Sequence, residues 1–397
     1  MSNYLPSKSE EKRGVEKIPG LKADGGNLST FKPIESSRLK FVGRPTFNPS
    51  PFLDPLSRRI YENPLKERDP ITSQTPKPPH LRVHCSKQEK IKLFELLDAS
   101  DRLLLAPPKL VTPAYGSGLF AVGKSLEKDR MILDSRGANI LEAPPNRWIR
   151  ALSAGELISR IHLQPDEDLL SSGSDLKDFY YFFRSTPARA YRNVLVGPMH
   201  PKELCHLHSF RPELLQSPTV YGCLNTLAMG DTQAVELAQA CHIGIAAQHQ
   251  IVNEQNLLSL QKPTPRTKDA VGIVIDDFVV LTKQKKDEEK PSSGAIRTSQ
   301  MEEAYQKVGL MPNIDKGFRD EEKATYWGLM WMVNLELSGD RFESYSSGRT
   351  DHRYGPNWIC YRRPFADFGR MPHFSFSLQE EISFTYGQHF REQQRTR

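Results

Sequence analysis

Cysteine is scarce in this chain, with five in 397 residues, and no two of them have the CxxC spacing. An odd number of cysteines without such a pair argues against a disulfide framework and against a zinc ribbon. The grouping of Cys205 with His206 and His208 leaves a zinc site open. Residues so close in sequence rarely point to one centre without partners elsewhere, so a surface turn is the preferred interpretation.

Long hydrophobic runs are also missing. No apolar stretch is long enough to cross a membrane, and the opening segment MSNYLPSKSEEKRGVEK lacks the apolar core of a secretory signal. The hydrophobic content of 38% and the mean hydropathy of −0.55 fit a soluble protein with polar tails. We therefore expect an intracellular protein, in the cytoplasm or the nucleus, with no membrane partner.

No internal repeat is visible, and Gly116-Ser117-Gly118 lacks the third glycine and the strand-turn-helix context of a dinucleotide-binding fingerprint. The length allows one large domain or two ordinary ones. A net charge of +6 is a mild excess that suits a polyanionic partner without requiring one.

Proline is abundant near the N-terminus, where it is spaced too densely for helices or central strands. This pattern predicts a disordered arm over residues 1–80. A folded domain is expected over 81–340, followed by an irregular tail over 341–397. That tail is rich in Arg, Tyr and Phe, which leaves open a role in gripping single-stranded nucleic acid.

The remaining patterns predict an α+β fold around an antiparallel sheet. Apolar residues at helical spacing predict a helix over 86–100, with a capping box formed by Ser86 and Glu89. Further helices are expected over 147–161, 229–248 and 301–310. Alternating or continuous apolar runs predict β-hairpins over 118–134 and 271–281.

The most distinctive local feature is Asp276-Asp277, which stands between the apolar β-forming runs GIVI and FVVL. An ordinary acidic β-turn would explain the pair. A second acidic position, Asp175, precedes the aromatic run FYYFF and could be a solvated strand end. If Asp175 ends a strand beside the hairpin, the carboxylates can surround a pair of divalent ions, as nucleotide phosphoryl transfer requires. Hard oxygen ligands favour Mg²⁺ or Mn²⁺ over Zn²⁺.

Taken in order, six segments resemble the sequence blocks of reverse transcriptases of the retroviral and retrotransposon type. The four stronger matches are GLFAVGKSLEKDRMILDSRGANI, SDLKDFYYFF, LAMGDTQAVELAQ and VIDDF. The weaker two are Gly309-Leu310 with Lys316, and ATYWGLMWM. The resemblance covers roughly residues 118–337, and the order of the blocks is far more specific than any single block.

The resemblance implies roles for the nucleotide-binding residues. Lys124 and Arg130 would contact the triphosphate of the incoming nucleotide. Tyr180 would take the aromatic position that excludes a ribose 2'-hydroxyl. Met229 and Gly230 would lie where the backbone approaches the template and the nucleotide.

It also implies a catalytic set. Asp175, Asp276 and Asp277 would hold two Mg²⁺ or Mn²⁺ ions, and Lys316 would protonate the leaving pyrophosphate. The expected fold is the fingers and palm of a right-hand polymerase with an antiparallel palm sheet. The expected activity is RNA-directed DNA synthesis by a retroelement enzyme, which transfers a nucleotide from a dNTP to a primer 3'-hydroxyl on an RNA or DNA template. Further polyprotein domains are expected as partners.

The chain departs from the family pattern in several places. Val274 stands where retroviral enzymes have tyrosine, and Ala228 where proline is usual. Longer spacing between blocks requires inserted loops, and no thumb or ribonuclease H pattern follows Arg341. Two alternatives therefore stay open: a catalytically decayed, nucleic-acid-binding retroelement remnant, and another carboxylate-metal enzyme such as a nucleotide cyclase. Retention of the three aspartates with Lys124, Arg130 and Tyr180 argues against simple decay.

Overall fold

The structure is a computed structural model that describes residues 31–143, 147–327 and 329–332. Its largest element is a five-stranded sheet with the order β10-β5-β9-β8-β7, in which only β7 and β8 pair in parallel. The strands are β5 (Glu167–Asp175), β7 (Leu257–Leu258), β8 (Asp269–Val274), β9 (Asp277–Lys285) and β10 (Phe318–Glu321). The expected mixed fold with an antiparallel sheet is confirmed.

Both faces of this sheet are covered. Phe278 and Val280 of β9 belong to the core beneath α6 (Ala234–Gln248) and α7 (Ser293–Val308). The alternate residues Val279 and Leu281 pack on the other face, with Leu157 and its neighbours. Successive side chains of a strand point to opposite faces, and burial on both faces explains the continuous apolar runs in the hairpin sequence.

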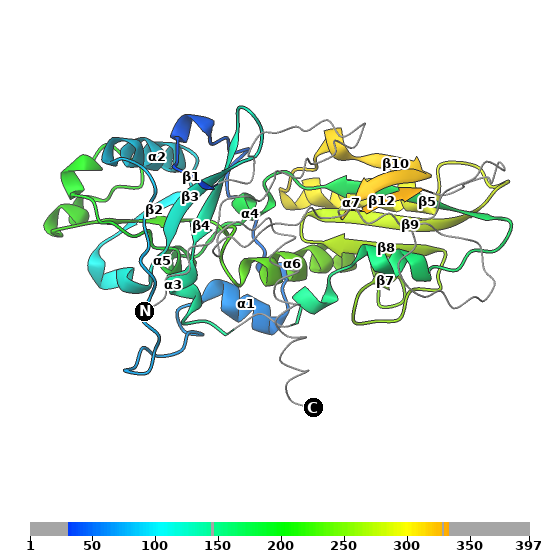
Figure 1. Cartoon of the computed structure of the whole chain (residues 1–397), viewed down its shortest axis with the longest axis horizontal. Coiled ribbons are helices and arrows are strands. Elements are labelled where there is room, and N and C mark those ends of the chain that lie inside the picture. The colour runs from blue at the N-terminus through cyan, green and yellow to red at the C-terminus, as the bar shows by residue number, and fades with distance from the viewer. Residues whose placement is uncertain (1–30, 144–146, 328, 333–397) are drawn as a thin grey trace, which may run out of the picture.

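The other half of the molecule contains smaller sheets around a separate core (Figure 1). The sheet β1-β3-β4 and the pair β2-β6 pack with α2 there. Their bounds are β1 (Phe31–Lys32), β2 (Leu103–Ala106), β3 (Gly118–Gly123), β4 (Asp129–Asp134), β6 (Tyr221–Leu224) and α2 (Lys87–Ala99). The remaining elements are α1 (Pro55–Glu62), α3 (Arg136–Asn139), α4 (Phe179–Phe182), α5 (Pro187–Arg192), and the hairpin of β11 (Lys323–Tyr326) and β12 (Leu329–Met332).

The prediction of a disordered arm is wrong for residues 31–80. Ile34, Phe47 and Tyr61 are each at most 2% exposed and belong to the two main cores. Pro55 occupies the first position of α1, where the missing N–H costs nothing, and Asp54 caps that helix. Dense prolines exclude long helices and central strands, but they do not prevent an irregular chain from burying isolated apolar side chains. Residues 1–30 and 341–397 lie outside the described residues.

Most of the other predicted elements are confirmed. Both expected hairpins form, as β3-β4 and β8-β9. Only half of the expected capping box forms at the start of α2: the Ser86 side chain accepts a hydrogen bond from the Glu89 N–H, whereas the Glu89 carboxylate accepts from Ser36. The predicted helices over 229–248 and 301–310 correspond to α6 and the second half of α7. Within the described residues, no helix combines the length and apolar composition needed to span a membrane.

The helix expected over 147–161 is wrong. The segment forms two short 3-10 helices, Ile149–Ala151 and Gly155–Arg160. Between them, the Ser153 hydroxyl accepts from the Ile273 N–H and donates to the Leu258 carbonyl. The backbone is thus hydrogen-bonded to the five-stranded sheet, which replaces helical bonds at this point.

Candidate metal and nucleotide site

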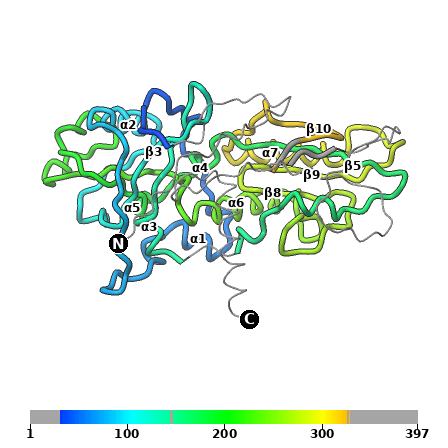
Figure 2. Tube along the Cα trace, in the orientation of Figure 1, coloured from blue at the N-terminus to red at the C-terminus, as the bar shows by residue number. Residues whose placement is uncertain are grey.

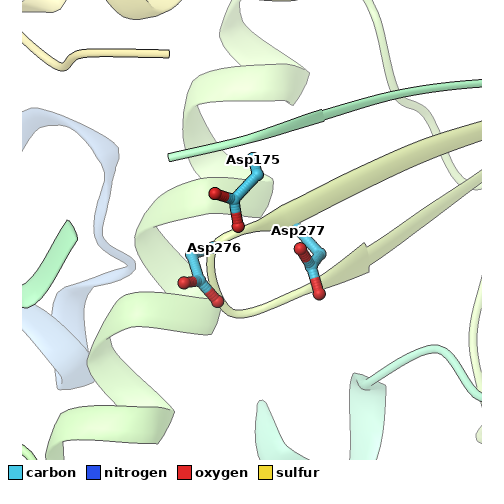
Figure 3. Close-up of side chains that lie close together, drawn as sticks. All are labelled: Asp175, Asp276 and Asp277. Atoms are coloured by element: carbon cyan, nitrogen blue, oxygen red, sulfur yellow. The ribbon is translucent and has the colours of Figure 1, made fainter. Parts of the chain in front are cut away.

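Three carboxylates meet at one end of the five-stranded sheet. Asp175 ends β5, Asp276 lies in the turn between β8 and β9, and Asp277 begins β9 (Figure 3). The register pairs Asp175 directly with Asp277, and one oxygen of each carboxylate lies within 4.8 Å of the others. Strand pairing therefore brings together acidic residues that are far apart in the sequence.

The turn that carries Asp276 has a strained backbone held by α6. Ile275 has φ +57°, a left-handed conformation that is costly for a β-branched residue. Gln239 accepts a hydrogen bond from the Ile275 N–H at 2.8 Å and donates one to the Ile273 carbonyl at 3.0 Å. These bonds tie both sides of the turn to one side chain of the helix.

His242 is one turn further along α6 and completely buried. Its Nδ1 donates to the Ile275 carbonyl at 2.7 Å, and its Nε2 accepts from the Tyr305 hydroxyl at 2.6 Å. A carbonyl can only accept, so Nδ1 carries a proton. Burial lowers the pKa of His242 to about 4, so the ring is neutral near pH 7 and its Nε2 accepts from Tyr305. This clamp was not predicted from the sequence. Its only signal was the spacing of Gln239 and His242, three positions apart within an otherwise mostly apolar helix.

Burial and mutual repulsion together raise the pKa values of Asp276 and Asp277. Burial, followed by the negative charge of Asp175, raises the pKa of Asp276 to about 6. Burial and the charges of both neighbours raise the pKa of Asp277 above its usual range. The Lys316 ammonium lies 3.0 Å from Asp175 Oδ2, and the Asn313 amide donates to the same oxygen at 2.9 Å. Hard oxygen donors with excess negative charge fit a divalent cation such as Mg²⁺ or Mn²⁺.

A cavity of about 390 Å³ opens beside these carboxylates. Most of the site residues expected from the sequence line it, namely Lys124, Arg130, Asp175, Tyr180, Met229, Asp276 and Lys316. Asp277 and Gly230 do not line it. The chain thus gathers side chains of separate sequence blocks, both cationic and acidic, around one cavity.

Gly230 serves close packing of the backbone. Its φ is +101°, and a Cβ at this position would lie 1.9 Å from the Leu133 carbonyl oxygen of β4. The neighbouring Met229 carbonyl accepts from the Leu133 N–H at 2.9 Å. Only glycine combines this conformation with so close an approach, and the contact fixes Met229 at the cavity.

A buried ion network lies behind the loop that contains Gly230. Asp231 pairs with Arg189 at 3.0 Å and with Arg192 at 2.9 Å, and Arg192 also pairs with Glu142 at 2.7 Å. The arginines and Asp231 have fully buried side chains, so removal of one partner would leave an uncompensated buried charge. These residues were not predicted from the sequence, because nothing in the local patterns indicates that they meet.

The zinc alternative gains no support. His206 pairs with Glu95, and His208 pairs with Asp98. Across the described residues, the three aspartates are the only group of His, Cys, Asp or Glu side chains close enough to share a metal ion.

No family model matches the chain, and no curated protein matches it. Among solved structures, it resembles a foamy viral protease-reverse transcriptase in complex with double-stranded DNA. Two such structures give TM-scores of 0.40 and 0.41, identities of 12% and 11%, and 66% coverage of this chain. The native enzyme of Prototype Foamy Virus gives a TM-score of 0.41, 14% identity and 71% coverage. The matches span 37%, 44% and 31% of those chains. Since these TM-scores are below 0.5, neither fold nor function is inferred from this likeness.

Proposed function

We propose that this chain is a reverse transcriptase that transfers a nucleotide from a dNTP to the 3'-hydroxyl of a primer on an RNA template. One observation carries the proposal: residues from separate sequence blocks line a single cavity, which contains Lys124 and Arg130 together with Asp175 and Asp276. An acidic β-turn alone would not require cations and an aromatic side chain around it. A polyphosphate substrate with its metal ions accounts for both sets of charged side chains, because the cations would bind the phosphates and the carboxylates would bind the metal.

The cations have the simplest roles. Lys124 and Arg130 lie on β3-β4 and its connecting loop, and both are exposed. They bind the phosphates of the incoming nucleotide and neutralise their charge. Lys316, held 3.0 Å from Asp175, supplies a proton to the pyrophosphate as its bond to the α-phosphorus breaks.

The carboxylates bind the metal ions. Asp175 and Asp276, with Asp277 beside them, hold Mg²⁺ or Mn²⁺ and keep them in a fixed position, because the strand register and the α6 clamp leave the turn little freedom. When bound, such ions lower the cost of charge at the attacking and leaving oxygens. Tyr180, which is 4% exposed, limits the space beside the nucleotide sugar and excludes ribonucleotides.

In this proposal, the half that contains β3-β4 is the fingers, and the five-stranded sheet with α6 and α7 is the palm. The expected domain over 81–340 extends toward the N-terminus to include residues 31–80, because those residues are part of both cores.

Primer extension tests the proposal. The full chain is incubated with dNTPs and a DNA primer annealed to an RNA template, with Mg²⁺ or with a chelator, in parallel with Asp276→Asn. We expect extension that requires the metal and is lost in the variant. Extension that survives in Asp276→Asn would locate the activity elsewhere. No extension on RNA or DNA templates, with Mg²⁺ or Mn²⁺, would favour the decayed nucleic-acid-binding protein.

A further inference from the structure

The N-terminal segment 36–43, here called the strap, crosses the cavity at its fingers side. Its first part is fixed by two charged groups. The Glu89 carboxylate accepts from the Ser36 N–H at 2.6 Å and from the Ser36 hydroxyl at 2.5 Å. The Arg38 guanidinium donates two hydrogen bonds to Asp129, at 2.8 and 3.1 Å. The strap is therefore bonded to both α2 and β4.

Its last part is fixed as firmly. Arg102, which is completely buried, donates to the carbonyls of Val42 and Gly43 at 3.0 Å, and its guanidinium lies 4.9 Å from the centre of the Phe41 ring. The Val42 N–H donates to Asp178 Oδ2 at 3.0 Å. Since Asp178 follows β5, this bond ties the strap to the connection between the metal-binding strand and α4.

Lys40 lies between these anchors. Leu39 is 2% exposed and packs in the core, whereas Lys40 is exposed and lines the same cavity as Lys124 and Arg130. Figure 2 shows the blue trace of the first described residues running close to β3 before it turns toward α1. The backbone on both sides of Lys40 is thus held in place while its side chain faces the cavity.

Two other lysines that line the cavity already have acidic partners. Lys124 lies 4.0 Å from Asp178, and Lys316 lies 3.0 Å from Asp175. Lys40 forms no ion pair within 4.0 Å among the residues that the structure describes. An unpaired ammonium on a fixed backbone, in a cavity that also contains Lys128 and Arg130, suits an anionic ligand.

We propose that the strap is a wall of the nucleotide site and that Lys40 binds the polyphosphate tail of the incoming nucleotide. This inference rests on the proposed function, and it adds a phosphate-binding residue from a segment outside all six sequence blocks. The same ammonium chemistry would also suit a backbone phosphate of the template or primer. The polyphosphate is favoured because Lys40 lines the cavity that contains Asp175 and Asp276.

The test compares Lys40→Ala and Lys40→Arg with a control, Lys66→Ala, which removes an exposed lysine of the N-terminal region that does not line the cavity. Four constants are measured on the full chain. They are the KM and the kcat for dNTP, the Kd for inorganic tripolyphosphate with Mg²⁺ by calorimetry, and the Kd for primer-template. For Lys40→Ala, we expect the KM for dNTP and the Kd for tripolyphosphate to rise about fivefold to tenfold, as loss of one charge-assisted contact implies. The kcat and the primer-template Kd should stay within about twofold. Lys40→Arg should restore most of the binding, and Lys66→Ala should match the unaltered protein.

The results separate the two proposals. Tripolyphosphate binding that depends on Lys40 in a protein that extends no primer would support the strap as a phosphate site and contradict the polymerase. Normal primer extension with unchanged nucleotide KM and tripolyphosphate Kd in Lys40→Ala would overturn only the role of Lys40. A variant that changes the primer-template Kd alone would assign Lys40 to nucleic acid and contradict the proposal. So would an unaltered protein that fails to bind tripolyphosphate.

Discussion

The cavity has two unlike sides. The carboxylate cluster of Asp175, Asp276 and Asp277 lies on paired strands, is largely shielded from water, and is clamped by α6. The opposite side, here called the cation wall, consists of exposed side chains on the strap and on β3-β4: Lys40, Lys124, Lys128 and Arg130. Rigid, desolvated charges act strongly over short distances, whereas exposed lysines adapt and are screened by solvent. The cluster should therefore control the chemical step, and the wall should control nucleotide affinity.

The largest expected effect is on catalysis and comes from the cluster. Asp175→Asn keeps the side-chain shape and removes a charged metal ligand, so nucleotide incorporation should fall roughly a thousandfold or more. Asp315→Asn is the matched control, because Asp315 lines the same cavity but its side chain is 88% exposed. Single-turnover rates should show at most a small change for Asp315→Asn. Equal losses in the two variants would remove the distinction between a cluster residue and an ordinary acidic neighbour.

The next effect concerns the packing of the N-terminal region that includes the strap. Phe47 is 1% exposed, stacks on Phe52 and packs edge-to-face against Phe183 in the core beneath α6. Phe47→Ala should lower the free energy of unfolding by about 3–5 kcal/mol, measured by denaturant titration. Phe31, which is 43% exposed, provides the control, and Phe31→Ala should cost far less. If both variants unfolded at the same denaturant concentration as the unaltered chain, the strap would not depend on a packed N-terminal region.

A third prediction uses the pH dependence of stability. The pKa of Asp276 is about 6 in the folded chain, above the ordinary value of 3.8. A raised carboxyl pKa means that folding favours the protonated form. Without metal, the contribution of Asp276 to the free energy of unfolding is therefore full below about pH 4 and is lost as pH rises through 6. The loss should be about 2–3 kcal/mol by pH 7 or 8. Thermal melts of metal-free protein should show this decline, and Asp276→Asn should make it shallower, leaving the part that is due to the raised pKa of Asp277. A profile that is as steep in Asp276→Asn would attribute the decline to other groups.

The smallest predicted effect tests the clamp. Tyr305→Phe removes the hydroxyl that donates to His242 Nε2 and leaves that nitrogen buried without its partner. Stability should fall by about 1–3 kcal/mol. A turn that is less well held should also lower kcat several-fold while leaving the nucleotide KM unchanged. A variant with lower stability but unaltered kcat would restrict this bond to a structural role.

How far the sequence alone predicts this molecule depends on the range of the interactions. The β8-β9 hairpin and its Asp276-Asp277 pair could be predicted, because two apolar runs around a short acidic turn are a local pattern. Asp175 could be placed beside them only through the order of the resembling blocks. The strand register that pairs Asp175 with Asp277 then accounts for their proximity.

The missed features all depend on long-range contacts. Gln239 and His242 are clamp residues only because α6 lies under the turn at Ile275. Proline density correctly excludes regular structure over much of 31–80, but it carries no information about isolated residues such as Tyr61 that reach a distant core. Ser153 interrupts the helix expected over 147–161 by bonding to strands that come much later in the sequence.

Direct metal binding tests the central claim, that the three aspartates form a divalent cation site. Mn²⁺ is titrated into the full chain and into Asp276→Asn, with bound ion measured by electron paramagnetic resonance in the presence of a dNTP and no primer. We predict saturable binding to the unaltered protein, competed by Mg²⁺ and weakened at least tenfold by the substitution, as loss of about 1.4 kcal/mol or more implies. Identical Mn²⁺ binding by the two proteins would contradict the account.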